Sequence, residues 1–371
     1  MRGTATMYGK QASDHSPGMS LSRRTLLWSA AALPLCAPKG MAQAVDDWTW
    51  YASHFLRDDG RIIDNGNGSQ SHTEGQGYGM LFAQASDDKQ AFEKIFSWTE
   101  NNLKLPDSAL HAWHYLPDTS PHVPDSNNAT DGDLLIALAL AFAGYRWQKS
   151  EYLKAARAIY KDVRKKLVLK IAGKRVLLPG CVGFSTPDAV TVNLSYYVMP
   201  SLILATGLDN AEVWRGLIKD GLTLIRNGRF GRWKLPPDWL QMSSHTGELS
   251  IAPQFPPRFS YDAVRVPLYL AWAGQLGGDL MAGFENYWTA WPAGGLPAWV
   301  DLKTGERSAY NAPPGFYDIG GACGFGNMAG AMPPVQSNEN YYSASLAMLS
   351  GLVKRQFGAD IMAAQYGRGK W

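Results

Sequence analysis

Hydrophobic positions along most of the chain recur at spacings of three and four residues, the pattern of helices that bury one face. The alternating pattern typical of strands is scarce. Helices are predicted over residues 48–55, 78–86, 89–103, 131–148, 152–168, 192–207, 211–227, 261–276, 279–291 and 340–357. The connections 117–128, 231–257 and 304–332 are rich in Gly, Pro and Asn and are predicted to be long loops. Many mid-length helices without a βαβ rhythm indicate one large all-α domain.

A first candidate site lies in residues 71–80, where a predicted loop becomes a helix. Glu74 is followed by Gly75, Gly77 and Gly79. Glycines allow close approach of a ligand or another backbone, and they lower helix stability unless other contacts compensate. Two interpretations stay open. Glu74 either only stabilises the positive N-terminal end of the helix as a first-turn acid, or it is a carboxylate that takes part in catalysis.

A second candidate site lies in residues 127–139. Thr130 or Asp131 could cap the following helix. Asp133 and the pair 127–128, both Asn, add more polar groups at this helix start than capping requires. A calcium loop is excluded because its regularly spaced oxygens and distal Glu are absent.

A third candidate site lies in residues 258–267. Asp262 and Arg265 are one turn apart at the start of a predicted helix, so an i,i+3 salt bridge is the simplest interpretation. With Glu74 and Asp131, the chain places an acid at three helix starts. Hydrolysis of a glycosidic bond needs one carboxylic acid to protonate the leaving oxygen and a second carboxylate to activate water or attack the sugar.

Composition narrows the classes of partner. The net charge is only +3, and no Lys/Arg cluster suggests nucleic-acid binding. Aromatic residues make up 12% of the 371 residues, with 14 Trp and 17 Tyr. Such rings fill cores, but they also serve as platforms for the apolar faces of sugars. The Cys and His residues are not spaced as metal ligands, so no metal or other cofactor is expected.

The first residues resemble an export signal. An apolar run follows the pair Arg23 and Arg24 and extends to Leu35, and residues 42–44 form a small-x-small cleavage pattern. The paired arginines fit a twin-arginine signal as well as an ordinary secretory one. A membrane anchor is the alternative, but the run is shorter than the roughly 20 residues needed to span a bilayer. Residues 1–44 are therefore predicted to be cleaved and residues 45–371 to form the mature domain, exported to the periplasm or the medium.

Cleavage after Ala44 would leave Cys181 and Cys323 in the mature chain. An oxidising compartment would permit a disulfide, and whether these two cysteines meet is left open.

Three motifs in order along the chain resemble glycoside hydrolase family 8. They are residues 129–137 around Asp131, the Glu-Gly-Gln-Gly-Tyr-Gly-Met segment that begins at Glu74, and the Phe-Ser-Tyr-Asp-Ala-Val-Arg segment that contains Asp262. Residues 193–200, 235–239 and 310–315 look like the endoglucanases of this family that are associated with bacterial cellulose synthase.

This resemblance implies an (α/α)6 barrel with an open cleft, and an inverting β-1,4-glycanase. Glu74 would be the general acid, Asp262 the general base and Asp131 the residue that holds the sugar beside the scissile bond. An inverting pair stands roughly 6.5–9.5 Å apart. Glu74 is then expected to have a raised pKa, whereas Asp262 is expected to stay ionised through Arg265 and Tyr261.

The predicted partners are β-1,4-glucan chains and the cellulose synthase complex, with no nucleic acid and no membrane span. Alternatives are a xylanase or chitosanase of the same family, or a non-catalytic glucan-binding component of a cellulose-export complex. For each aromatic candidate, core packing remains an alternative to sugar contact. The residues expected to bind substrate are Trp113, Tyr115, Asn193, Tyr196, Trp239, Arg265 and Tyr310.

Overall fold

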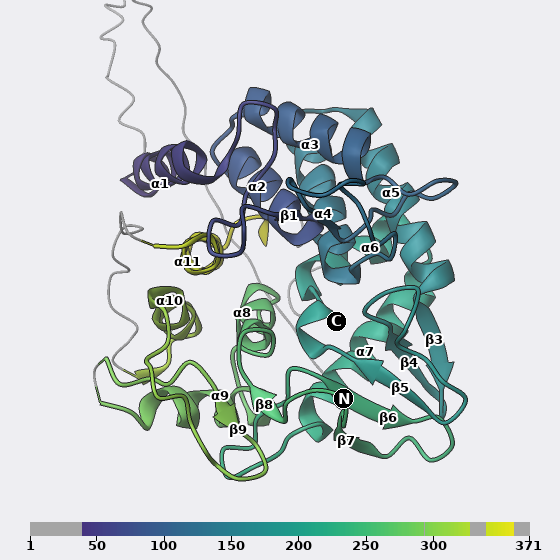
Figure 1. Cartoon of the computed structure of the whole chain (residues 1–371), viewed down its shortest axis with the longest axis vertical. Helices are drawn as coiled ribbons and strands as arrows, with labels where there is room; N and C mark the ends of the chain where they lie inside the picture. The colour runs from purple at the N-terminus through teal and green to yellow at the C-terminus, as the bar shows by residue number, and fades with distance from the viewer. Residues whose placement is uncertain (1–38, 293, 327–338, 360–371) are drawn as a thin grey trace, which may run out of the picture. The chain divides into compact units, whose positions relative to one another are not determined.

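Buried helices alternate with amphipathic helices along the chain in the computed structural model, which describes residues 39–292, 294–326 and 339–359 (Figure 1). All described residues belong to one compact unit, Pro38–Trp371. The buried helices are α2 (Thr73–Ala85), α4 (Thr130–Arg146), α6 (Met199–Leu208), α8 (Arg265–Trp272), α10 (Pro314–Cys323) and α11 (Tyr341–Lys354).

These buried helices form a closed inner ring. Each packs against the next in the order α2, α4, α6, α8, α10 and α11, and α11 packs against α2. Because neighbours cover them on more than one side, they do not have the single apolar stripe of a surface helix. Every residue of α4 from Thr130 to Gly144 is buried, for example.

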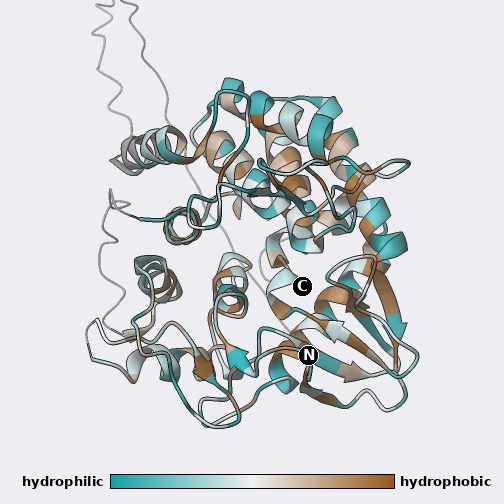
Figure 2. Ribbon diagram, viewed as in Figure 1, coloured by the Kyte–Doolittle hydropathy of each residue, from teal (hydrophilic) through white to brown (hydrophobic). Residues whose placement is uncertain are grey.

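The outer helices alternate with the inner ones in sequence, beginning with α1 before α2, and pack against them. They are α1 (Lys39–Phe55), α3 (Lys89–Leu103), α5 (Ser150–Lys166), α7 (Ala211–Asn227) and α9 (Asp279–Thr289). In Figure 2 hydrophilic residues lie along α3 and α5, as expected of helices with one solvated face. Side-chain caps fix several starts: Asp88 accepts from the Ala91 N–H before α3, and Asn210 accepts from the Val213 N–H before α7.

Short strands lie in the connections between helices. The strands are β1 (Ser71–His72), β2 (His114–Tyr115), β3 (Val168–Ile171), β4 (Lys174–Leu177), β5 (Ala189–Val192), β6 (Leu240–Ser243), β7 (Leu249–Ile251), β8 (Arg258–Phe259) and β9 (Val300–Asp301). All pairs are antiparallel: β1 with β2, β3 with β4, β5 with β6 and then β7, and β8 with β9. Two of these pairs, β1–β2 and β8–β9, lie next to the ends of helices that carry candidate residues.

The helical pattern located most helices well. The predicted bounds of α3 and α7 agree with the structure, and those of α4, α5, α9 and α11 differ by a few residues. The prediction of one helix over 192–207 is wrong at its start. Residues 189–192 form β5, residues Leu194–Tyr196 form a 3-10 turn, and α6 begins only at Met199. Pro200 explains this start, because a proline in a helix interior removes a hydrogen bond and clashes with the preceding turn.

Three elements were hidden in predicted loops. Helix α10 lies within 304–332, where Pro314 at its first position and several glycines suggested a loop. Its glycines serve packing: a Cβ on Gly315 would lie 2.4 Å from the backbone oxygen of Ser343 in α11. Strands β6 and β7 lie within 231–257, and they are too short to give an alternating pattern among Gly and Pro.

Most of the predicted export signal lies in residues 1–38, outside the described residues, and residues 39–44 begin helix α1. In the part of the chain that the structure describes, no helix is long and apolar enough to cross a membrane. Cys181 and Cys323 are both free thiols, which answers the question left open above: they do not pair with each other.

Candidate active site

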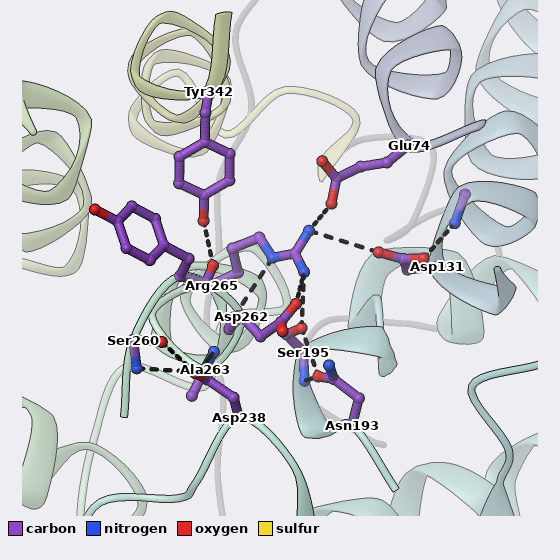
Figure 3. A network of polar contacts seen from close by, with 12 residues as sticks. Glu74, Asp131, Asn193, Ser195, Asp238, Ser260, Asp262, Ala263, Arg265 and Tyr342 are labelled. Carbon is purple, nitrogen blue, oxygen red and sulfur yellow. Dashed lines mark hydrogen bonds and ion pairs between the residues drawn. The ribbon is translucent and has the colours of Figure 1, made fainter. Parts of the chain in front are cut away.

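The guanidinium of Arg265 lies at the centre of a cluster of carboxylates (Figure 3). Its Nη1 atom contacts a carboxylate oxygen of Glu74 and lies 3.5 Å from Oδ2 of Asp131. Its Nη2 atom lies 2.8 Å from Oδ1 of Asp262. The Arg265 side chain is only 3% exposed, so these contacts form away from bulk water. One cation therefore joins the three acids that the sequence places at separate helix starts.

Glu74 lies in the first turn of α2, and neighbouring backbone fixes where that helix begins. The Thr73 N–H donates to the Trp113 carbonyl at 3.0 Å, and β1 pairs with β2 through His72 and His114. No side chain caps α2. The Glu74 side chain is 16% exposed, so it is reachable from solvent while most of it is covered.

The glycines after Glu74 serve contacts within the protein. A Cβ on Gly75 would lie 2.8 Å from the Tyr341 hydroxyl, and one on Gly77 would lie 2.6 Å from Cβ of Leu135 in α4. A Cβ on Gly79 would lie 2.7 Å from Ile62. The sequence left open whether these glycines approach a ligand or another part of the chain. In the structure all three approach other parts of the chain.

Asp131 lies inside the first turn of α4 and does not cap it. The cap position is Ala129, which makes no side-chain bond, so the capping interpretation was wrong. Instead, Oδ1 of Asp131 accepts from the Gly132 N–H at 2.9 Å, and Thr130 donates its hydroxyl to the Leu178 carbonyl at 2.7 Å. Oδ2 of Asp131 is left facing Arg265.

Asp262 lies in a turn just before α8, and the buried side chain of Asp238 holds that turn. Oδ1 of Asp238 accepts from the Ser260 N–H at 3.0 Å and from the Ala263 N–H at 2.8 Å, and Oδ2 accepts from the Ser260 hydroxyl. The predicted i,i+3 ion pair between Asp262 and Arg265 is confirmed at 2.8 Å. The Asp262 side chain is 30% exposed and is the most open of the three acids.

The ionisation expected for Asp262 was only partly right. Arg265 forms the expected ion pair, which favours the carboxylate. Burial, followed by the charges of Asp238 and Asp131, nevertheless raises the pKa of Asp262 well above its usual value. Tyr261 does not donate to it as expected, because its side chain interacts with Tyr310.

Asp131 is shifted in the same direction. Burial raises its pKa to about 7, although the Gly132 N–H opposes the shift. Three buried or half-buried acids around one guanidinium exceed its charge, so the cluster favours keeping a proton near neutral pH. A site that retains a proton beside an ionisable carboxylate can carry out general acid and general base chemistry.

The extra polar groups near Asp131 form a separate structural network. Asp133 accepts from Nδ1 of His111 at 2.9 Å and from the Asn128 amide at 3.0 Å. Nε2 of His111 lies 3.1 Å from Glu100. Asn127 and Asn128 both bind the backbone of residues 181–182. The additional polar residues at this helix start therefore connect it to a neighbouring loop by hydrogen bonds.

Asn193 and Tyr196 lie beside the acids. Oδ1 of Asn193 accepts from the Ser195 hydroxyl at 2.7 Å, and that hydroxyl accepts from Nη2 of Arg265 at 3.1 Å. The Asn193 amide lowers the pKa of Asp262, against the effect of burial. Burial and the charges of Asp131 and Asp262 raise the pKa of Tyr196, so its hydroxyl stays protonated next to both carboxylates.

Trp239 packs among other aromatic rings. Its ring stacks on Phe255 at 4.4 Å between centroids and lies parallel to Phe184 at 5.8 Å. Its edge meets Tyr196 at 6.2 Å, which places it next to the acid cluster. At least one face of Trp239 is thus used for packing.

The remaining aromatic candidates are Tyr115, Trp113 and Tyr310. Tyr115 stacks on His122 at 4.7 Å, and Arg61 lies over its ring, so packing partners cover it. Trp113 donates its indole N–H to Asp125 at 2.8 Å. Tyr310 is 55% exposed, the most open of the group.

Sequence reasoning gave no role to three residues of the network in Figure 3. These are Ser195, Asp238 and Tyr342, whose hydroxyl donates to the Tyr261 carbonyl. Ser195 and Asp238 lie in the motifs 193–200 and 235–239, so the signal was present as a resemblance. Their contacts could not be predicted because their partners are far away in the chain.

Comparisons with known proteins agree with this geometry. The model of the family "Glycosyl hydrolases family 8" matches residues 24–356. A probable endoglucanase of Novacetimonas hansenii is 48% identical over 324 residues, covering 87% of this chain and 94% of that protein. An endoglucanase of Cellulomonas uda is 37% identical over 285 residues, covering 77% and 78%.

Solved structures show the same fold. An endo-β-1,4-glucanase of Acetobacter xylinum superposes with a TM-score of 0.82 at 47% identity, covering 85% of this chain and 99% of that chain. An endoglucanase of Komagataeibacter sucrofermentans superposes with a TM-score of 0.81 at 50% identity, covering 84% and 98%. The expected (α/α)6 barrel is confirmed, and the closed ring from α2 to α11 is its inner layer.

Proposed function

Because the chain belongs to glycosyl hydrolases family 8, we propose that Glu74 is its general acid, Asp262 its general base and Asp131 the residue that holds the sugar beside the scissile bond. The observation that carries this proposal is the convergence of all three carboxylates on Arg265. Structural ion pairs need no such excess of acid around one cation, and the desolvation of so many carboxylates is costly.

The protein is a glycoside hydrolase, an endo-1,4-β-glucanase that cuts internal bonds of cellulose. We propose that it inverts the anomeric centre. Asp262 takes a proton from a water molecule, whose oxygen forms a bond to the anomeric carbon. The bond from that carbon to the glycosidic oxygen breaks, and Glu74 gives its proton to the leaving oxygen. The exposure of Asp262 supports its role, since a base needs access to water.

Arg265 has a supporting role in this scheme. Its guanidinium holds Glu74 and Asp262 on opposite sides, and its contact with Ser195 fixes its orientation. Protonation of Glu74 removes the charge that Arg265 attracts. The protonated acid therefore occurs together with an Arg265 Nη1 group that is released from its ion pair with Glu74, while Nη2 stays paired with Asp262.

Substrate contacts are proposed for residues beside the acids and for aromatic residues farther away. Asn193, Tyr196 and Arg265 would bind the sugars next to the scissile bond. The exposed ring of Tyr310 would stack on a glucosyl unit farther along the chain. Packing partners occupy part of each of the other three rings. The contact with substrate would therefore come from the polar edge or one ring face of Trp113, Tyr115 and Trp239.

Export and a role in cellulose synthesis are also proposed. The apolar run after Arg23 and Arg24 supports cleavage after Ala44. Edman sequencing of the processed protein tests this: a start at Val45 is expected, and an intact N-terminus on exported protein would refute it. Association with a cellulose synthase complex would be tested by co-purification of the two, with recovery abolished when the synthase is deleted.

The catalytic roles are tested with the mature chain on soluble carboxymethylcellulose, following reducing ends and viscosity together. Viscosity should fall early in the reaction. Glu74→Gln and Asp262→Asn should each lose most activity, whereas Glu248→Gln, an exposed carboxylate, should not. Proton NMR of fresh product should show the α-anomer. A β-anomer, or an active Glu74→Gln variant, would refute the scheme.

The same assay distinguishes related substrates. A reducing end xylose-releasing exo-oligoxylanase of Halalkalibacterium halodurans is 34% identical over 108 residues, which cover 27% of this chain. Xylan and chitosan are therefore included as substrates. Faster cleavage of either one than of cellulose would change the assigned substrate but not the proposed chemistry. Binding of cello-oligosaccharides without any cleavage would favour a non-catalytic role.

A further inference from the structure

Asp238 is a buried carboxylate whose described hydrogen bonds all go to the backbone and side chains around Asp262. It is 8% exposed, and it accepts from the N–H groups of Ser260 and Ala263 and from the Ser260 hydroxyl. Its own N–H donates to the Arg258 carbonyl at 2.8 Å. Figure 3 shows it behind the turn, on the side away from Glu74.

Holding this turn does not require a charge. A neutral amide could accept the two N–H bonds through its oxygen and donate to the Ser260 hydroxyl, which can rotate to accept. Burying a carboxylate is costly unless its charge is compensated. Within the described residues Asp238 forms no ion pair, whereas Asp262 lies 2.8 Å from Arg265. The charge on Asp238 is therefore stabilised by hydrogen bonds from Ser260, Ala263 and Asp262, and no cation among the described residues neutralises its effect on neighbouring groups.

Other charged and titratable groups surround the Asp262 carboxylate. Arg265 of α8 attracts its negative charge, and Asp131 of α4 repels it. Tyr196 and Tyr342, from the 3-10 turn and from α11, stay neutral because burial raises the pKa of both hydroxyls. Asp238 and Asp131 are thus the two carboxylates whose charges act on Asp262, with the larger effect from Asp238.

We propose that Asp238 is a positioning residue with two separable actions on Asp262: its hydrogen bonds fix the turn, and its negative charge makes Asp262 a stronger base. The inference rests on the proposed role of Asp262. Burial, then the charge of Asp238, raises the pKa of Asp262, and burial also raises the pKa of Asp238. A stronger base takes the proton of water more readily, provided that the pH is high enough to ionise it.

Asp238→Asn separates the two actions, because its amide can keep the hydrogen bonds with Ser260 and Ala263 while the charge is removed. The expected result is a folded enzyme whose acid limb of kcat/KM moves to lower pH. A shift of about one to two pH units corresponds to a unit charge roughly 6–12 Å away at an effective dielectric constant of about 20. Activity at the pH optimum should fall only several-fold, since the base is weaker but correctly placed.

The matched control is Asp301→Asn. Oδ1 of Asp301 accepts from the N–H groups of Lys303 and Thr304, each at 2.8 Å, so this side chain also holds a turn, one that does not contain Asp262. The acid limb of kcat/KM for Asp301→Asn should lie at the same pH as in wild type. Asp238→Ala removes charge and hydrogen bonds together and should lose far more kcat than Asp238→Asn, with a smaller change in KM.

A folded Asp238→Asn enzyme with an unshifted acid limb would overturn the proposal. A second measurement covers the case in which this variant does not fold. Carboxyl carbon NMR of wild type and of Asp262→Asn should show Asp238 titrating at lower pH once Asp262 is neutral, because the coupling is reciprocal. Unchanged titration of Asp238 would also overturn the proposal. Failure of the catalytic scheme is distinct, since it would appear as an active Asp262→Asn enzyme.

Discussion

Gly132 and Thr73 hold helices α4 and α2 so close together that no side chain fits between them. A Cβ on Gly132 would lie 2.0 Å from the Thr73 hydroxyl oxygen, 2.5 Å from its Cβ and 2.8 Å from the Glu74 backbone nitrogen. This contact lies between Asp131 and Glu74 in space. It therefore sets how closely two of the three acids approach each other.

Gly132→Ala should reduce both stability and activity. Alanine favours a helix over glycine by about 1 kcal/mol, so any loss must come from the contact with Thr73 and Glu74. Overpacking of this kind costs about 1–3 kcal/mol, and displacement of Glu74 by a fraction of an ångström should lower kcat about tenfold or more. Thermal unfolding and initial rates measure the two effects.

Gly277→Ala is the control for this substitution. No atom lies within 4 Å of a Cβ at position 277, and the residue needs no positive φ. This variant should behave like wild type. Full activity in Gly132→Ala would show that the spacing of α2 and α4 tolerates a methyl group and is not set here.

Arg265→Lys should inactivate the enzyme although it keeps the positive charge. A lysine ammonium cannot present two nitrogen atoms to Glu74 and Asp262 at once. Breaking a buried ion pair typically costs about 3–5 kcal/mol, so kcat/KM should fall at least about a hundredfold. Arg226→Lys is the control, because Arg226 pairs with Asp279 at the surface and is 44% exposed. Retention of half the wild-type kcat/KM by Arg265→Lys would contradict the assigned role.

The sequence was sufficient for most of the helices and for the three acids, because both depend on local patterns. Apolar spacing located α4 and α7, and the acids stood out at helix starts. The glycines after Glu74 were recognised as sites of close approach, but their partners could not be named. Gly77 faces Leu135 and Gly75 faces Tyr341, contacts that depend on the closed ring.

The part that could not be predicted depends on residues distant in the chain. Asp238 acts on a turn more than twenty residues later, and nothing in its own segment indicates this. The expectation that Asp262 stays ionised was only partly right for the same reason. It was based on the neighbouring Arg265, whereas buried carboxylates from other segments raise the pKa of Asp262. Helix α10 was missed because its Pro and Gly residues are typical of loops until the packing against α11 is known.

Removal of the Tyr310 ring should affect substrate binding, whereas removal of the Trp239 ring should affect stability. Tyr310 is 55% exposed, whereas Trp239 stacks on Phe255. Tyr310→Ala should raise KM for cello-oligosaccharides about two- to tenfold, the effect of losing one stacking contact, without a change in thermal stability. Trp239→Ala should lower the unfolding temperature by several degrees. Tyr310→Phe keeps the ring and should keep KM; a large rise in KM there would mean that the hydroxyl, and not the ring, makes the contact.

The buried network around His111 should make stability depend on pH. Despite burial, which opposes the shift, hydrogen bonds to Asp133 and Glu100 raise the pKa of His111 from 6.5 to about 9. A histidine with a raised pKa contributes its full stabilisation below the unfolded value of 6.5 and loses it as the pH rises through 9. The loss corresponds to about 3 kcal/mol over this range. Urea unfolding at pH 6, 7.5 and 9.5 measures it.

His111→Gln should be less stable at pH 6 and should vary much less than wild type between pH 6.5 and 9. Asp131 and Asp318, with pKa values of about 7, also titrate in this range and are present in both proteins, so the comparison reports on the network of His111, Asp133 and Glu100 as a whole. His245→Gln is the matched control, because His245 meets Asp188 at 3.1 Å on the surface, where the pair contributes little. If His111→Gln keeps the pH dependence of wild type, the network does not hold a charged histidine and the stabilisation of the start of α4 must come from its hydrogen bonds alone.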